Sequence, residues 1–117
     1  MANDADFSRI MFQGLLEELI GSSHVYFQPP SSVKLVYPCI IYNLSDIAVN
    51  RADNKAYIQE SLYEVTYIDK NPDNTIKDEI IKVFPKCRFN RHFTNDNLNH
   101  YVYLISYKNG GIINGTS

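Results

Sequence analysis

The chain has 117 residues, a formal net charge of −2, 44% hydrophobic residues and 21% charged residues. This length predicts one domain that buries enough apolar surface to fold without disulfide bonds. The acidic balance argues against non-specific binding to nucleic acid, which needs a basic face that displaces counterions from phosphates. No apolar run approaches the ~20 residues of a membrane span, and the acidic N-terminus is unlike a signal peptide. We therefore expect a protein that is made in a cytoplasm and has no membrane partner.

The first predicted element is an amphipathic helix. Apolar residues recur from Phe7 to Ile20 at spacings of three and four, which is the pattern of a helix with one wide apolar face. Gly21 is placed to end this helix in a left-handed conformation. The width of the apolar face indicates packing on a sheet, with area to spare for a neighbouring subunit.

Three strands are predicted next. His24–Phe27 is a short strand, and Tyr37–Leu44 contains an apolar run that predicts burial on both faces and a central position. Asp46–Ala56 is polar and charged, so we expect an unusually long loop there. Tyr57–Asp69 alternates apolar and polar residues and is the clearest strand of the chain.

A short helix follows the third strand. Thr75 with Asp78 resembles a capping box that opens the helix, and Pro85 stops it. The residues that we expect to fill the core of the protein are Ile40, Ile41, Val65, Ile80, Val83, Phe84 and Leu104.

A hairpin of Cys87–Phe93 and Leu98–Tyr107 closes the predicted fold. The fold class is therefore α+β: a single, mainly antiparallel sheet of about five strands with two helices packed on one face. Residues 1–107 form the single domain, and 108–117, rich in Gly and Asn, form a flexible C-terminal tail. The other face of the sheet is left for a partner, and nine tyrosines suit a protein interface.

Two arrangements resemble enzyme chemistry. Asp73 after a proline, followed by Glu79 and Lys82, resembles the acids and lysine of some nucleases. The second acid is one residue too far from the lysine and falls on a helix, so turn chemistry is favoured for Asp73. Cys39 with a histidine would make a nucleophile–base pair. Its apolar surroundings favour a buried structural thiol instead.

A metal site is the third chemical alternative. His92, Asp96 and His100 lie on the closing hairpin and would supply two imidazoles and a carboxylate if the strand register brought them together. The favoured interpretation is that residues 94–97 form turns held by their own side chains. We therefore predict no catalytic residues, no metal site and no cofactor, and expect that the protein is not an enzyme.

Four stretches of the chain form a recognisable set: Tyr37–Tyr42, Ala52–Lys55, Ile68–Asp73 and Asn90–Tyr101. Together they resemble a small protein family of long-tailed bacteriophages and prophages, the tail terminator or tail completion proteins of the neck. The resemblance runs from roughly Tyr26 to Tyr107.

This resemblance implies a structural virion protein that acts in virus assembly. Members of the family form a ring, six-fold in the family, that caps the tail tube, stops its polymerisation and takes part in head–tail joining. The implied partners are copies of the chain itself, the tail tube protein and the head–tail connector protein, while DNA passes through the ring without specific binding. The implied location is the tail or neck of the virion, assembled in the bacterial host cytoplasm. The loop between the central strands faces a neighbour or the tube in such rings, which implies subunit or tube interface residues at Arg51, Asp53, Asn54, Lys55 and Tyr57.

Two alternatives stay open from the sequence. One is another neck component, a head-completion adaptor or stopper, which has the same partners and a similar size. The other is a small phage enzyme or nucleic-acid-binding regulator. The acidic balance and the missing chemical site both disfavour this second alternative.

Overall fold

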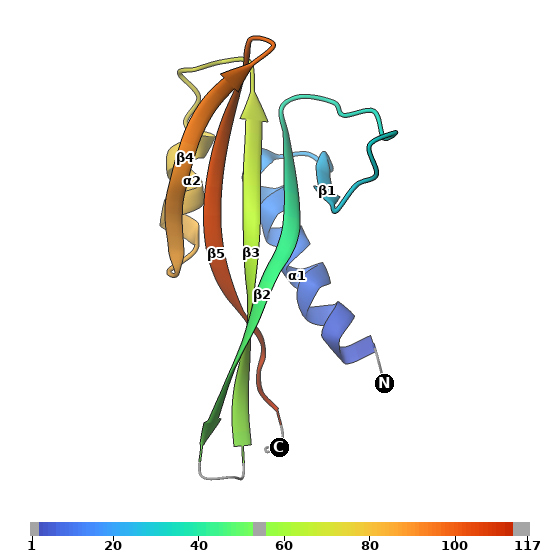
Figure 1. Ribbon diagram of the computed structural model, residues 1–117, viewed down its shortest axis with the longest axis vertical. Helices are drawn as coiled ribbons and strands as arrows, with labels where there is room; N and C mark the ends of the chain where they lie inside the picture. The colour runs from blue at the N-terminus through green and yellow to red at the C-terminus, as the bar shows by residue number, and fades with distance from the viewer. Residues whose placement is uncertain (1–2, 53–55, 114–117) are drawn as a thin grey trace.

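The protein is an α+β domain built on one five-stranded sheet. A computed structural model describes the backbone of residues 3–52 and 56–113 and the side chains of residues 8–49 and 60–108. The sheet has the order β1-β2-β3-β5-β4; β1 and β2 are parallel and the other neighbours antiparallel. Both helices lie on the same side of the sheet, here called the helix face (Figure 1); the opposite side is called the open face. The elements are α1 (Asn3–Ile20), β1 (Val25–Phe27), β2 (Cys39–Ala52), β3 (Ala56–Asp69), α2 (Ile76–Val83), β4 (Cys87–Asn95) and β5 (Leu98–Ile113).

The hydrophobic core lies between the two helices and the helix face. Phe12 and Leu16 of α1 are fully buried, as is Ile80 of α2. The alternation predicted for β3 is confirmed, because every second residue from Tyr63 to Tyr67 enters this core. Phe12 is its centre. The rings around Phe12, with centroids 4.5 to 5.4 Å away, are those of Tyr42, Tyr63, Phe84 and Tyr107.

The predicted core is partly confirmed. Its buried members are Ile40, Val65, Ile80 and Phe84. Ile41 and Leu104 are half-buried because they alternate onto the open face of the sheet. Val83 was placed wrongly: it lies on the solvent side of α2 and is 46% exposed.

Polar contacts fix α1 on the sheet. The Tyr42 hydroxyl donates to Gln13 Oε1 at 2.8 Å and accepts from Arg9 Nη1 at 3.1 Å. The Arg9 guanidinium also lies 4.4 Å from the centroid of the Phe27 ring. Gly21 ends the helix as predicted, with a φ of 70° and its N–H donating to the Glu17 carbonyl at 2.9 Å.

The start of α2 differs from the predicted capping box. The Thr75 side chain makes no capping hydrogen bond. Asn74 caps the helix instead, because its Oδ1 accepts the Lys77 N–H at 3.0 Å while its Nδ2 donates to the Asn71 carbonyl at 2.7 Å. An asparagine side chain accepts an N–H of the first helical turn as well as threonine does, and here it also closes the preceding turn.

Replacing Asn74 by alanine is expected to lower the free energy of unfolding by about 1 kcal/mol, because it removes this cap. The matched control is Thr75→Ala, which should cost less than about 0.5 kcal/mol. Urea unfolding followed by circular dichroism measures both values. Equal losses in the two variants would contradict the assignment of the cap to Asn74.

Two strands are longer than predicted. The expected loop at Asp46–Ala56 is wrong: β2 continues to Ala52, and its residues pair with β3 up to Ala52 opposite Ala56. The expected flexible tail begins too early, because β5 continues to Ile113 and pairs there with Tyr57; residues 114–117 lie outside the described residues. Both errors have one cause. A long β3 needs partners along its whole length, since unpaired backbone groups are costly.

Candidate functional site

A three-stranded arm extends from the domain. It consists of residues 44–52 of β2, 56–62 of β3 and 107–113 of β5. Figure 1 shows these strands running past the level where the sheet is covered by α2, while α1 diverges from them. The molecule is accordingly elongated, with extents of 51 × 26 × 22 Å. The arm therefore extends beyond the part of the sheet that α2 covers.

The arm exposes apolar side chains on the helix face. Ile47 pairs with Ser61, which is buried on that face, and Val49 follows two residues later on the same side. Their exposed fractions are 45% and 43%. Exposed aliphatic side chains that are grouped on one face mark a candidate surface for a partner. The signal in the sequence was the Ile-x-Val spacing, which was obscured by the polar residues before and after it.

The arm also has an open backbone edge. β1 pairs with β2 as far as Tyr42, and the Gln28 side chain accepts the Leu44 N–H at 3.2 Å. Beyond Leu44, no described residue pairs with the outer side of β2. An unpaired strand edge is a template for the addition of another strand.

The structure brings two of the predicted interface residues together. Arg51 of β2 pairs directly with Tyr57 of β3 near the end of the arm. The other three predicted residues, Asp53, Asn54 and Lys55, lie outside the described residues, so their role stays a prediction. The two described members of the predicted interface, Arg51 and Tyr57, therefore lie on paired strands rather than in a long loop.

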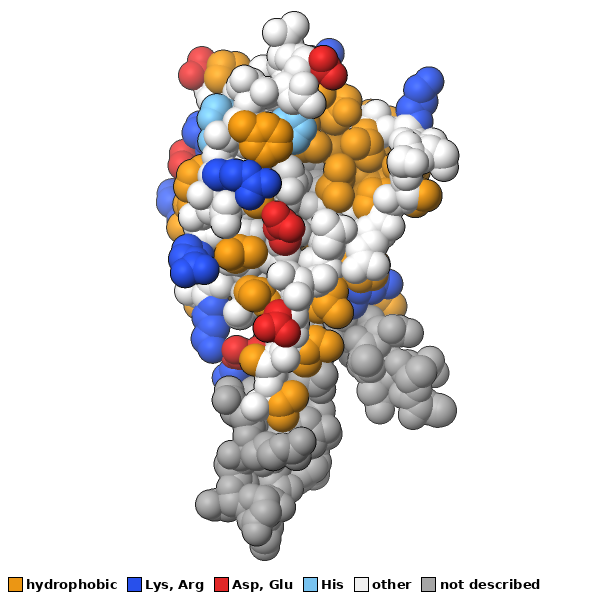
Figure 2. Space-filling model, in the orientation of Figure 1, with side chains coloured by type: hydrophobic (Ala, Val, Ile, Leu, Met, Phe, Trp, Pro, Cys, Tyr) orange, Lys and Arg blue, Asp and Glu red, His pale blue; other side chains and the backbone are white. Residues whose placement is uncertain are grey.

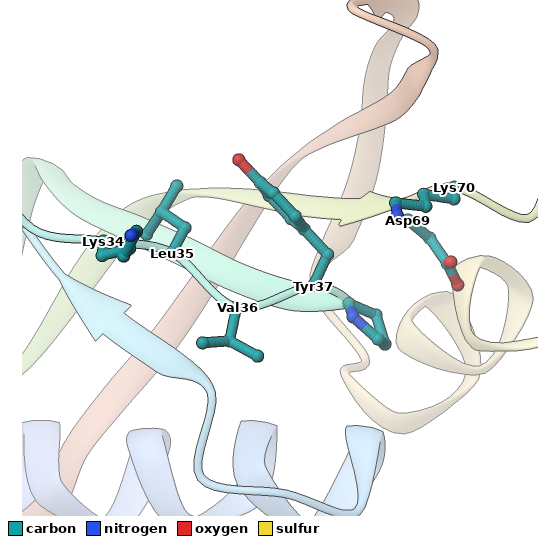
Figure 3. Close-up of a pocket in the computed structure, with 7 residues that line it drawn as sticks. Lys34, Leu35, Val36, Tyr37, Asp69 and Lys70 are labelled. Atoms are coloured by element: carbon teal, nitrogen blue, oxygen red, sulfur yellow. The ribbon is translucent and has the colours of Figure 1, made fainter.

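A pocket of about 380 Å³ lies at the opposite end of the sheet, where the connection between β1 and β2 meets the end of β3 (Figure 3). Its lining includes Lys34, Tyr37, Asp69 and Lys70. The Asp69 carboxylate is already engaged at both oxygens, because it accepts the Tyr67 hydroxyl at 2.5 Å and the Asn71 N–H at 3.0 Å. This acid therefore holds the turn after β3 and is not directed to a ligand.

The predicted metal alternative is not assembled by the hairpin of β4 and β5. His92 pairs with Tyr101 on the helix face, whereas His100 pairs with Phe93 on the open face. The two imidazoles therefore point to opposite sides of the sheet. Asp96 lies in the turn between the strands with a φ of 53°. Among the described residues, no group of three His, Cys, Asp or Glu side chains is placed to bind a metal ion.

The thiol alternative is disfavoured by burial. Cys39 has no exposed surface, and this burial raises its pKa to about 12. A thiol with so high a pKa carries almost no nucleophilic thiolate near neutral pH. Asp73, the first acid of the nuclease alternative, is an exposed turn residue whose N–H donates to the Asn71 side chain at 3.0 Å. Turn chemistry therefore accounts for it.

Comparisons with known proteins add no relative. No protein-family model matches the chain, and no curated protein shows significant similarity to it. Within the described part of the chain, no helix combines the length and hydropathy needed to cross a membrane.

Proposed function

We propose that this chain is a structural virion protein, the tail terminator of a long-tailed bacteriophage. In this proposal copies of the chain form a ring, six-fold as in the family that the sequence resembles. The ring caps the tail tube, stops its polymerisation and joins it to the head connector. DNA passes through it without specific binding, which suits a chain of formal charge −2.

The observation that carries the proposal is the arm. A monomeric domain has little use for a three-stranded extension that exposes Ile47 and Val49 beside an open strand edge. An assembly subunit needs such a surface, because it must bury apolar area against a neighbour or the tube. The pocket and the His, Cys and Asp positions described above offer no converging set of reactive groups, so an assembly role is favoured over an enzyme.

The test is a capping assay with purified protein. Tail tube protein is polymerised with and without the chain, and tube lengths are measured by electron microscopy. A tail terminator is expected to bind at tube ends as a ring and to shorten the tubes. A ring that binds isolated portal complexes and leaves tube length unchanged would favour the adaptor or stopper alternative instead.

An Ile47→Asp/Val49→Asp variant is expected to abolish capping while the fold stays intact. Both side chains are about half exposed, so their replacement changes the stability of the free subunit little, whereas burying two carboxylates in an interface is strongly unfavourable. The readouts are tube length and thermal unfolding. Val33→Asp, a similarly exposed apolar position outside the arm, is the matched control. Normal capping by the arm variant would mean that the arm is not the interface.

A further inference from the structure

The sheet has a second open edge besides the arm. β4 is the last strand in the order β1-β2-β3-β5-β4, and all its residues after Cys87 are exposed. It has nine residues and pairs with β5 on one side. No described residue pairs with its other side. One molecule therefore carries two strand edges that no described strand pairs, although on the arm the Ile47 N–H donates to the Asp46 carboxylate at 2.8 Å. β3 and β5 separate the two edges, so they cannot meet within one chain.

The helix face of the β4 edge carries an apolar area around Phe89. Phe89 pairs with buried Tyr103, and the two ring centroids are 5.5 Å apart. Beside Phe89 lies a shallow groove of about 300 Å³, lined also by Ile81 of α2 and by Tyr101. Phe89 and Ile81 are 47% and 45% exposed. A strand added to β4 would place every second side chain over this groove.

The open face of the β4 edge is basic. Arg88 pairs with Leu104, and Arg91 pairs with Val102, so both guanidinium groups lie on the side away from the helices. Lys86 precedes them but is engaged by Glu60 at 2.6 Å. Figure 2 views the open face and shows Lys and Arg side chains gathered along its β4 side. A strand that adds here is favoured if it carries an acid on the open face.

The free edge of the arm has the complementary pattern. Asp46 pairs with Leu62 on the open face, and Ile47 pairs with Ser61 on the helix face. Val49 follows on the helix face. Read along the strand, the arm therefore offers an acid to the open face and two aliphatic side chains to the helix face. The acid is complementary to the basic open face of the β4 edge, and the aliphatic side chains are complementary to the apolar groove on its helix face.

We propose that the free edge of β2 in one copy pairs with the edge of β4 in the next copy. Ile47 and Val49 then lie over the groove beside Phe89, and Asp46 faces Arg88 and Arg91. The contact is head-to-tail, because it joins two different edges, and repeating it generates a closed ring or an open helix of subunits. The inference rests on the proposed function and names the subunit contact of that ring.

Like-with-like pairing is less favourable. A two-fold contact between two β4 edges would bring the Arg88 and Arg91 side chains of both copies close together, where like charges repel. A contact between two arm edges would leave both Phe89 grooves exposed. Pairing β2 of one copy with β4 of the next supplies hydrogen-bond partners to both strand edges and places opposite charges together. A second copy of the chain in a head-to-tail arrangement therefore fits both surfaces.

Charge reversal tests the pairing. One variant carries Asp46→Arg, and a second carries Arg88→Glu with Arg91→Glu. Each reversal is expected to weaken self-association about tenfold or more, because it places like charges on adjacent strands. Sedimentation velocity of the full chain measures the association. Matched controls are Asp73→Arg and Lys34→Glu/Lys70→Glu, which make the same charge changes at exposed positions away from both edges.

The decisive step is to mix the two variants. An alternating assembly then contains two kinds of contact. In one, an unchanged arm meets an unchanged β4 edge; in the other, the arm that carries Asp46→Arg meets the β4 edge that carries the two glutamates. Both contacts are attractive, so we expect the mixture to regain wild-type association while each variant alone stays dissociated. Circular dichroism confirms that every variant is folded.

The outcomes separate this contact from the proposed function. Wild-type protein that stays monomeric, single variants that associate like wild type, or a mixture that stays dissociated would each overturn the pairing. Tube capping is scored independently. If the variants cap tubes and associate like the wild type, the pairing is refuted and the proposed function stands. If the mixture regains association but the wild type does not cap tubes, the pairing stands and the proposed function is refuted.

Discussion

Replacing Phe12 by alanine is expected to lower the free energy of unfolding by about 3–5 kcal/mol. Phe12 has no exposed surface, and its ring contacts four other aromatic rings from β2, β3, β5 and the end of α2. These rings belong to different elements, so they cannot all move inward to fill the space, and a cavity remains. Urea unfolding of the full chain measures the loss.

Met11→Ala is the matched control for this prediction. Met11 is the neighbouring residue of α1, has a similar volume and is 50% exposed. Its replacement should change stability by less than about 0.5 kcal/mol. Similar losses in the two variants would mean that α1 is held mainly by its polar contacts through Arg9 and Gln13, and not by the aromatic cluster.

Alkaline pH is expected to destabilise the protein between pH 10 and pH 11, by up to about 1 kcal/mol for each buried tyrosine whose pKa is raised well above 10. Burial raises the pKa of four tyrosines above the ordinary value near 10, and for Tyr67 a hydrogen bond to the Asp69 carboxylate raises the pKa further. In the unfolded chain these phenols ionise near pH 10, while the folded protein keeps their protons to higher pH. The unfolded state then binds fewer protons, so stability is complete below pH 10 and falls as the pH rises above it. The four tyrosines are Tyr42, Tyr63, Tyr67 and Tyr103.

Urea unfolding at pH 9, 10 and 11 measures this dependence, and the ultraviolet absorbance of phenolate shows when the tyrosines ionise. In a Tyr103→Phe variant the slope above pH 10 should fall by up to about 1.4 kcal/mol per pH unit, the contribution of one phenol. If the folded protein formed phenolate near pH 10, the ordinary pKa of tyrosine, the prediction would be contradicted, because these hydroxyls would then reach water without unfolding.

Elements that are set by local chemistry could be predicted from the sequence. Gly21 ends α1 because glycine adopts positive φ without steric cost, and the alternation of Tyr63, Val65 and Tyr67 defines β3 because side chains in a strand alternate between two faces. The number of strands and the two helices follow from such signals. The α+β class with one mainly antiparallel sheet was therefore accessible before the structure.

Elements that depend on pairing with a distant part of the chain could not be predicted from the sequence. Asp46, Asn50 and Arg51 are poor strand residues by themselves, yet they form strand because β3 offers them a complete row of backbone partners. Lys108–Ile113 contains two glycines and is strand for the same reason. The candidate site depended on these pairings, so its exposed residues Ile47 and Val49 were taken for parts of a loop.

The irregular pairing at the base of the arm has a consequence for how such a protein can diverge. Ser45 is an extra residue in β2, because Leu44 pairs with Tyr63 and Asp46 pairs with Leu62. A bulge of this kind bends the strand and increases its twist. Loss of Ser45 would remove the bend but leave each later residue opposite the same partner, so Ile47 would keep its face. A single-codon deletion would thus change the direction of the arm without changing the surface it presents, and a lineage could change the two in separate evolutionary steps.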